Sequence, residues 1–212
     1  MYTGLKFESG IFFTVASLRE RKKAETRQRI ADVATSMFVE RGFDGVTVAE
    51  IAEAADVSKV TVFNYFPRKE DILLDRLPQA HELLTRAIRE RDAGEPPMHA
   101  LRRLFVGLAK QGHPLGGFQD SFPSFWRTVL DSAALRARAR EAVEELEAHL
   151  AGLLADIDPH PRLTAALVIA AFRTVYAETA SRMLAGATAD EVTTDHIAAV
   201  DHAFDTLAGG LK

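Results

Sequence analysis

Four polar side chains within a short stretch form the group in this sequence best suited to recognising another molecule. They are Lys59, Thr61, Asn64 and Tyr65. Asparagine can bond an adenine edge through two hydrogen bonds, and lysine can reach guanine acceptors or a phosphate. Threonine and tyrosine can contact a phosphate or a thymine methyl group. This combination predicts a surface that reads double-stranded DNA.

Two short helices joined by a turn are expected to hold these side chains. Residues 47–66 read TVAEIAEAADVSKVTVFNYF. Thr47 and Glu50 have the spacing of a capping box, Ser58 is a favourable N-cap, and Pro67 cannot continue a helix. The proportions are those of a helix-turn-helix. The apolar residues of the motif are expected to face a preceding helix: Val48, Ile51, Ala52, Val57, Val62, Phe63 and Phe66.

The remainder of the chain is also expected to be helical. Apolar residues recur at three- and four-residue steps, and no alternating run is bracketed by hairpin turns. We therefore expect an all-α protein of about nine helices. The expected ranges are 18–41, 47–55, 58–66, 68–91, a helix around 101–108, 125–130, 133–154, 162–185 and 190–208.

Charge divides the chain into a basic front and an acidic body. The formal net charge is −4, yet residues 17–69 carry ten basic and eight acidic groups, while residues 70–212 are net acidic. A basic segment on an acidic body suits a DNA-binding unit attached to a larger partner. We expect a flexible arm over 1–16, a DNA-binding domain over 17–69 and a regulatory and dimerisation domain over 70–212.

Composition and motifs exclude several classes of protein. With no cysteine there is no disulfide, cysteine-ligated metal or thiol nucleophile. The longest uninterrupted apolar run, residues 165–172, is far shorter than the roughly 20 residues that cross a bilayer. No GxGxxG, Walker, HExxH or serine-elbow motif is present. We expect a cytoplasmic protein that is not an enzyme and has no cofactor or membrane partner. Asp156, Asp158 and His160 favour an interhelical turn over a metal site.

The stretch from about Thr26 to Leu74 resembles the TetR/AcrR family of bacterial transcriptional regulators. The matching segments are RGFDGVTVAEIAEAADVSKVTVFNYF and the PRKEDIL that follows. The resemblance implies a three-helix amino-terminal helix-turn-helix domain, followed by a larger helical domain that binds a ligand and dimerises.

The resemblance also implies a set of DNA contacts. Thr47 would contact a phosphate at the start of the first motif helix, Ser58 would cap the recognition helix, and Lys69 would hold a phosphate. Lys59, Val60, Thr61, Asn64 and Tyr65 would face the groove, and Arg27 belongs to the basic flank. Two positions depart from the family pattern. Phe63 replaces a phosphate-binding tyrosine, and Val60 replaces a small residue, offering an apolar contact to a thymine methyl group.

Two further sites are expected in the body. An apolar pocket for a small apolar or amphipathic effector would be lined by Phe105, His113, Phe118, Phe122, Phe125, Trp126, Phe172 and Tyr176, with His113, Arg127 or Arg173 as a polar anchor. A homodimer interface would be formed by Leu163, Leu167, Ala170, Ala177, Leu184, Ile197, Val200, Phe204 and Leu207. The aromatic residues could instead be ordinary core, and the last two helices could simply cover their own core.

The function expected is that of a ligand-responsive transcriptional repressor. A dimer would bind a palindromic operator, because one helix-turn-helix makes too few contacts for specificity, and a small molecule would release it. One alternative is a helical adaptor that binds only protein, which would leave the basic flank and Asn64 without a role. A helical enzyme is the other alternative.

Overall fold

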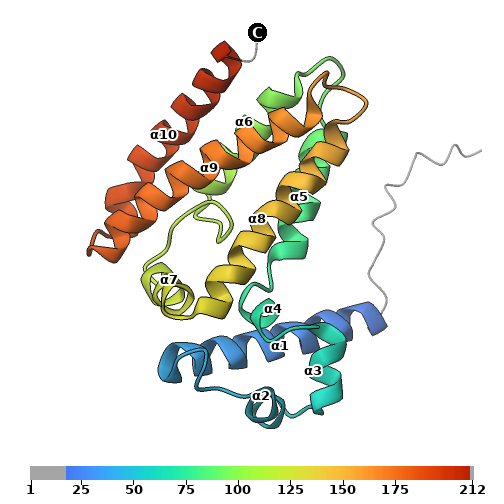
Figure 1. Ribbon diagram of the computed structural model, residues 1–212, viewed down its shortest axis with the longest axis vertical. Helices are drawn as coiled ribbons and strands as arrows, with labels where there is room; N and C mark the ends of the chain where they lie inside the picture. The colour runs from blue at the N-terminus through green and yellow to red at the C-terminus, as the bar shows by residue number, and fades with distance from the viewer. Residues whose placement is uncertain (1–17, 211–212) are drawn as a thin grey trace, which may run out of the picture.

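The first three helices form a small amino-terminal unit, which we call the reader. The computed structural model describes residues 18–210, so the expected arm over 1–16 lies outside the described residues. The reader consists of α1 (Leu18–Arg41), α2 (Val48–Ala54) and α3 (Lys59–Tyr65), drawn at the bottom of Figure 1. After α1, Gly42 has a φ of +76°, a left-handed conformation that suits glycine and ends the helix.

Local capping sets the two motif helices. Thr47 and Glu50 form the expected capping box at the start of α2. At the start of α3 the Ser58 hydroxyl accepts a hydrogen bond from the Thr61 amide. Between them Asp56 has a φ of +51°, a conformation that aspartate tolerates better than most residues. The helix-turn-helix therefore folds as its sequence predicts.

The expected single helix over 68–91 is wrong, because the structure divides it into α4 (Glu70–Leu73) and α5 (Leu77–Arg89). Pro78 lies in the first turn of α5. A proline ring clashes with the carbonyl four residues earlier, here that of Leu74, so one helix cannot run through both positions. The described residues consequently form ten helices and no strand, which confirms the all-α fold with one more helix than expected.

Five further helices complete the body. These are α6 (Pro97–Lys110), α7 (Phe122–Asp131), α8 (Ala133–Leu154), α9 (Pro161–Leu184) and α10 (Ala189–Gly210). In Figure 1, α9 and α10 lie side by side at the end of the molecule away from the reader. By length and composition alone α9 is apolar enough to cross a membrane. About a third of its apolar segment is buried, and the helix packs against α8 and α10.

The core of the reader continues into the body. Ile30, Phe38 and Ile51 are fully buried at its centre. The same cluster includes Ile72 of α4 and Leu135 of α8. A second cluster fills the space between α5, α6, α8, α9 and α10. Because apolar packing crosses from one unit to the other, α4 links the reader to α8 rather than forming a free hinge.

Candidate nucleic-acid interface

The outward face of α3 is the surface with the strongest potential for DNA contact. Val62 is buried against the reader core, whereas Lys59 and Asn64 are exposed. Val60 is 68% exposed and Phe63 is 50% exposed. The expectation that Phe63 faces α1 is therefore wrong, because Val62 and Phe66 fill the core side of the helix and leave Phe63 on the opposite face.

Two of the expected DNA-contacting hydroxyl groups already take part in caps. Thr47 Oγ1 donates to Glu50 Oε2 over 2.7 Å, and Thr61 Oγ1 lies 2.8 Å from Ser58 Oγ. Arg41 also bonds Glu50, at 2.7 Å. Hydrogen bonds from Arg41 and then Thr47 lower the pKa of Glu50 to about 2. The start of α2 is thus held by an ionised carboxylate.

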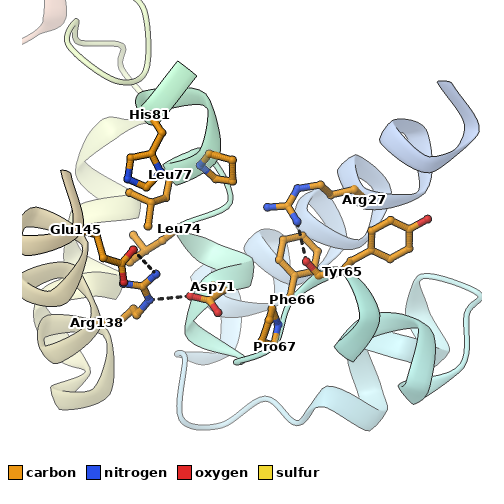
Figure 2. A pocket seen from close by; sticks show the side chains of 11 residues that line it. Arg27, Tyr65, Phe66, Pro67, Asp71, Leu74, Leu77, His81, Arg138 and Glu145 are labelled. Carbon is orange, nitrogen blue, oxygen red and sulfur yellow. Dashed lines mark hydrogen bonds and ion pairs between the residues drawn. The ribbon is translucent and has the colours of Figure 1, made fainter. Parts of the chain in front are cut away.

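Arg27 holds the end of the recognition helix. Its guanidinium donates to the Tyr65 carbonyl at 2.8 Å and to the Asp75 carbonyl at 3.0 Å, and it lies 4.1 Å from the centre of the Phe66 ring. Figure 2 shows the bond to Tyr65 at the side of a small cavity of about 280 Å³. These contacts give Arg27 a structural role within the reader, and its contact with DNA stays a prediction.

Lys69 is also engaged within the reader. Its ammonium donates to the Phe43 carbonyl at 2.5 Å and lies 4.0 Å from the Phe43 ring centre. Partial burial lowers the pKa of this ammonium. Tyr65 is half-buried against the reader core. Each of these two residues therefore has a structural role besides any contact with DNA.

A charged cluster that the sequence analysis missed joins α4 to α8. Arg138 is only 7% exposed and donates to Asp71 at 2.7 Å and to Glu145 at 2.9 Å, as Figure 2 shows. Arg68 donates to Glu141 at 2.7 Å. Arg138 and Asp71 are 67 residues apart in sequence, so no local pattern could have paired them. This cluster fixes the reader relative to α8.

A larger cleft opens between the reader and the body. Its volume is about 590 Å³, and α1, α5, α7 and the segment before α7 supply most of its lining. Phe122, Phe125 and Tyr176 line it, as expected from the sequence. Burial raises the pKa of Tyr176, so its phenol stays neutral. The cleft also has a polar lining from α1 and the α4–α5 connection that no pattern in the sequence indicated: Gln28, Asp32, Thr35, Asp75 and Arg76.

The other expected pocket residues lie elsewhere. Phe105 stacks on Phe172 at 4.2 Å in the core of the body. Phe118 is buried, with its ring 5.0 Å from that of Tyr176, and so stands behind the cleft wall. His113 Nδ1 accepts a hydrogen bond from the Leu115 amide, and this bond stabilises the segment before α7. Trp126 packs between two core clusters.

The suggested polar anchors in the body are not part of the cleft lining either. Arg127 and Arg173 are both exposed. The Asp158 carboxylate accepts the His160 amide at 2.7 Å and the Thr164 hydroxyl at 3.0 Å at the start of α9. No group of three or more potential metal ligands gathers among residues 18–210. The hydrogen bonds of Asp158 agree with the interhelical turn expected here.

The expected dimer surface is partly exposed and partly core. On α9, Leu163 is 52% exposed, and Ala170 and Ala177 are exposed. Val200 and Phe204 of α10 are 1% and 2% exposed, so the expectation that they meet a second copy is wrong: both fill this chain's own core. The half-buried members of the set are Leu167, Leu184, Ile197 and Leu207.

Comparison with known proteins identifies relatives of this fold. The family model described as "Bacterial regulatory proteins, tetR family" matches residues 30–75. The HTH-type transcriptional regulator TcmR of Streptomyces glaucescens is 31% identical over 171 residues, 76% of this chain and 76% of that protein. The HTH-type transcriptional repressor DhaR of Mycobacterium sp. (strain GP1) is 31% identical over 102 residues, 45% of this chain and 52% of that protein.

A solved structure shares the helical architecture along most of the chain. The SmeT-Triclosan complex matches 86% of this chain and 91% of that one, with a TM-score of 0.54 and 16% identity. At that identity the likeness concerns the fold. It extends the similarity beyond the reader and into the body that contains the cleft.

Proposed function

This chain belongs to the TetR family of bacterial transcriptional regulators, and we propose that it represses transcription as a dimer on a palindromic operator until a small molecule releases it. Its relatives are regulators that bind DNA through a helix-turn-helix, which sets aside the enzyme alternative. We propose the cytoplasm as its location, because that is where bacterial DNA is found.

The exposed face of α3 is the observation that carries the proposal. Lys59, Val60 and Asn64 are directed away from the reader core, where a major groove could receive them. Thr47, Ser58 and Thr61 hold the helix ends in place and border this face. We propose that Lys69 and Tyr65 contact phosphates at its edge. An adaptor that binds only protein would not require this set of side chains.

Dimerisation is supported by the stripe along α9. Leu163, Leu167, Ala170, Ala177 and Leu184 recur at steps of three, four or seven residues, so they share one face of the helix. Small residues allow two helices to approach closely. Two copies joined along α9 would present two α3 helices to successive turns of DNA, as a palindrome requires.

Ligand release is supported by the position of the cleft. Its walls come from α1 of the reader and from α5 and α7 of the body, so a bound molecule touches both units. A molecule that binds more tightly to a conformation in which the reader has moved relative to the body stabilises that conformation. In it the dimer no longer binds the operator. A difference of about 3 kcal/mol between the two states lowers operator occupancy more than about a hundredfold.

The boundary between the two domains is also part of the proposal. We propose residues 17–69 as the DNA-binding domain and 70–212 as the regulatory and dimerisation domain. The boundary is a packed one, because Ile72 and Leu73 of α4 belong to the reader core. Movement of α4 would therefore carry the reader with it.

The test is a footprint of the full chain on the DNA upstream of its own gene and on a selected random library, at stated salt. A protected palindrome supports the proposal. A sedimentation run with that DNA should show two chains per site. No protected site in either DNA would refute operator binding, and one chain per site would refute the dimer.

A further inference from the structure

The outward face of α3 contains an apolar pair that its polar neighbours do not explain. Val60 and Phe63 are among the most exposed large apolar side chains in the described part of the chain. Side chains three and four residues apart on a helix are neighbours, so Val60 borders both Phe63 and Asn64. The pair therefore lies at the centre of the surface proposed to meet DNA.

Neither side chain contributes to the core of the reader. Val62 and Phe66, each 1% exposed, occupy the core side of α3 and its end. A phenylalanine left half in water has an apolar surface available to a binding partner. The residues beside it, Lys59 and Asn64, are polar and exposed. The patch is thus a small apolar area inside a polar, partly cationic surface.

The floor of a DNA major groove presents a matching pattern. The thymine C5-methyl group is the apolar group that the four base pairs expose there. Asparagine pairs with the N6 and N7 atoms of adenine, and the thymine of the same base pair presents its methyl group in the same groove. An asparagine beside an apolar pair therefore complements neighbouring A·T pairs.

We propose that Val60 and Phe63 form a methyl-reading patch that selects thymine in each half-site, next to the adenine contacted by Asn64. This proposal rests on the operator binding proposed above. It assigns Phe63 a role in base selection. The comparison with the family pattern indicated only that Phe63 lacks the hydroxyl group with which a tyrosine would contact a phosphate.

The experiment uses uracil in place of thymine, because uracil lacks only the C5-methyl group. A binding site is first selected from a random duplex library with the full chain. Each thymine is then replaced singly by deoxyuridine, and the Kd is measured at one salt concentration. At one or two positions in each half-site, uracil should weaken binding roughly three- to fivefold, the factor expected from losing one buried methyl contact.

Variants assign the effect to the patch. Phe63→Ala and Val60→Ala should each abolish the thymine-over-uracil preference at one position, while Phe63→Tyr, which keeps the ring, should retain it. Leu130→Ala is the matched control, because Leu130 is similarly exposed (46%) but lies on α7, away from α3. Circular dichroism verifies that each variant is folded, as expected for substitutions at exposed positions.

The possible outcomes distinguish failure of the methyl-reading patch from failure of operator binding, on which it rests. Failure to select any site would refute operator binding and the patch together. A selected site in which uracil is tolerated at every thymine, or which contains no thymine in its half-sites, overturns the methyl-reading patch alone. Equal loss of affinity for thymine and uracil sites in Phe63→Ala would show that Phe63 acts only through shape or packing, and would also overturn it.

Discussion

Asn64 and Lys59 are both exposed on α3 and differ in the DNA groups that they can recognise. An amide can form two directed hydrogen bonds with one base, whereas an ammonium is a point charge that binds any phosphate. Both side chains are exposed, so their removal should leave the reader folded. Lys69 is a poorer test of phosphate binding, because its bond to the Phe43 carbonyl makes it part of the reader's structure.

Asn64→Ala should reduce discrimination between the selected site and single-base variants by about 1–3 kcal/mol at one position. Lys59→Ala should weaken all duplexes by a similar factor and lower the salt dependence of binding. Competition binding at several salt concentrations measures both effects. Equal, sequence-independent losses in the two variants would contradict the role given to Asn64.

Glu50 should make the start of α2 sensitive to acid. Its pKa is lowered from 4.5 to about 2 by Arg41 and Thr47, so the folded protein binds this proton less readily than the unfolded chain. Its contribution to stability is present above about pH 4.5 and is lost as the pH falls toward 2.

Glu50→Gln should accordingly lower the Tm at pH 7 and have a smaller effect near pH 2.5, measured by circular dichroism. Glu53→Gln is the control, since Glu53 is an exposed carboxylate on the same helix outside the capping box. An equal change in Tm at both pH values would show that the ionised form of Glu50 does not support the cap.

At the scale of the helices, the contact between α4 and α8 determines how the reader is held. Arg138 is nearly buried, and its carboxylate partners come from two helices: Asp71 from α4, and Glu141 and Glu145 from α8 itself. Removing one partner of a buried ion pair costs more free energy than removing one partner of an exposed pair. The buried charge that remains has neither a hydrogen-bond partner nor surrounding water.

Asp71→Asn should lower the free energy of unfolding by about 1–3 kcal/mol. The matched control is Glu82→Gln, which breaks the exposed ion pair with Arg86 and should cost less than about 1 kcal/mol. Urea denaturation measures both. A loss for Asp71→Asn no larger than that of the control would mean that the cluster does not hold α4 to α8.

Across the whole molecule, the reader and the stripe of α9 proposed for dimerisation lie at opposite ends. Figure 1 shows α3 at one end and α9 with α10 at the other. Apolar contacts through Leu135 and charged contacts through Arg138 join the reader to α8 of the body. A change at the cleft can therefore alter the distance between two α3 helices in a dimer.

Ala177→Glu should convert the dimer to a monomer, because it places a charge on the exposed stripe of α9 where a second copy is proposed to pack. Ala148→Glu, an exposed alanine on α8, is the control and should leave the dimer intact. Analytical ultracentrifugation distinguishes the two states. If Ala177→Glu remains dimeric, the interface lies elsewhere.

The sequence by itself determined the helix-turn-helix, because its signals are local. The Thr47–Glu50 capping box, the Ser58 N-cap and the Pro67 stop each involve groups a few residues apart, and all three lie where expected. The division between α4 and α5 was also locally encoded, in Pro78. The family model matches residues 30–75, which contain this stretch, and the relative TcmR extends the similarity over 171 residues.

Only the tertiary structure decided which side of each element faces a neighbour. Helical spacing could not tell whether Phe63 is core or surface, since that depends on how closely α1 and α2 cover α3. The two carbonyl partners of Arg27 lie 38 and 48 residues away, and Arg138 bonds Asp71 across 67 residues. The cleft is lined from six helices and the loops between them. Such contacts arise from the packing of distant segments, and no short pattern specifies them.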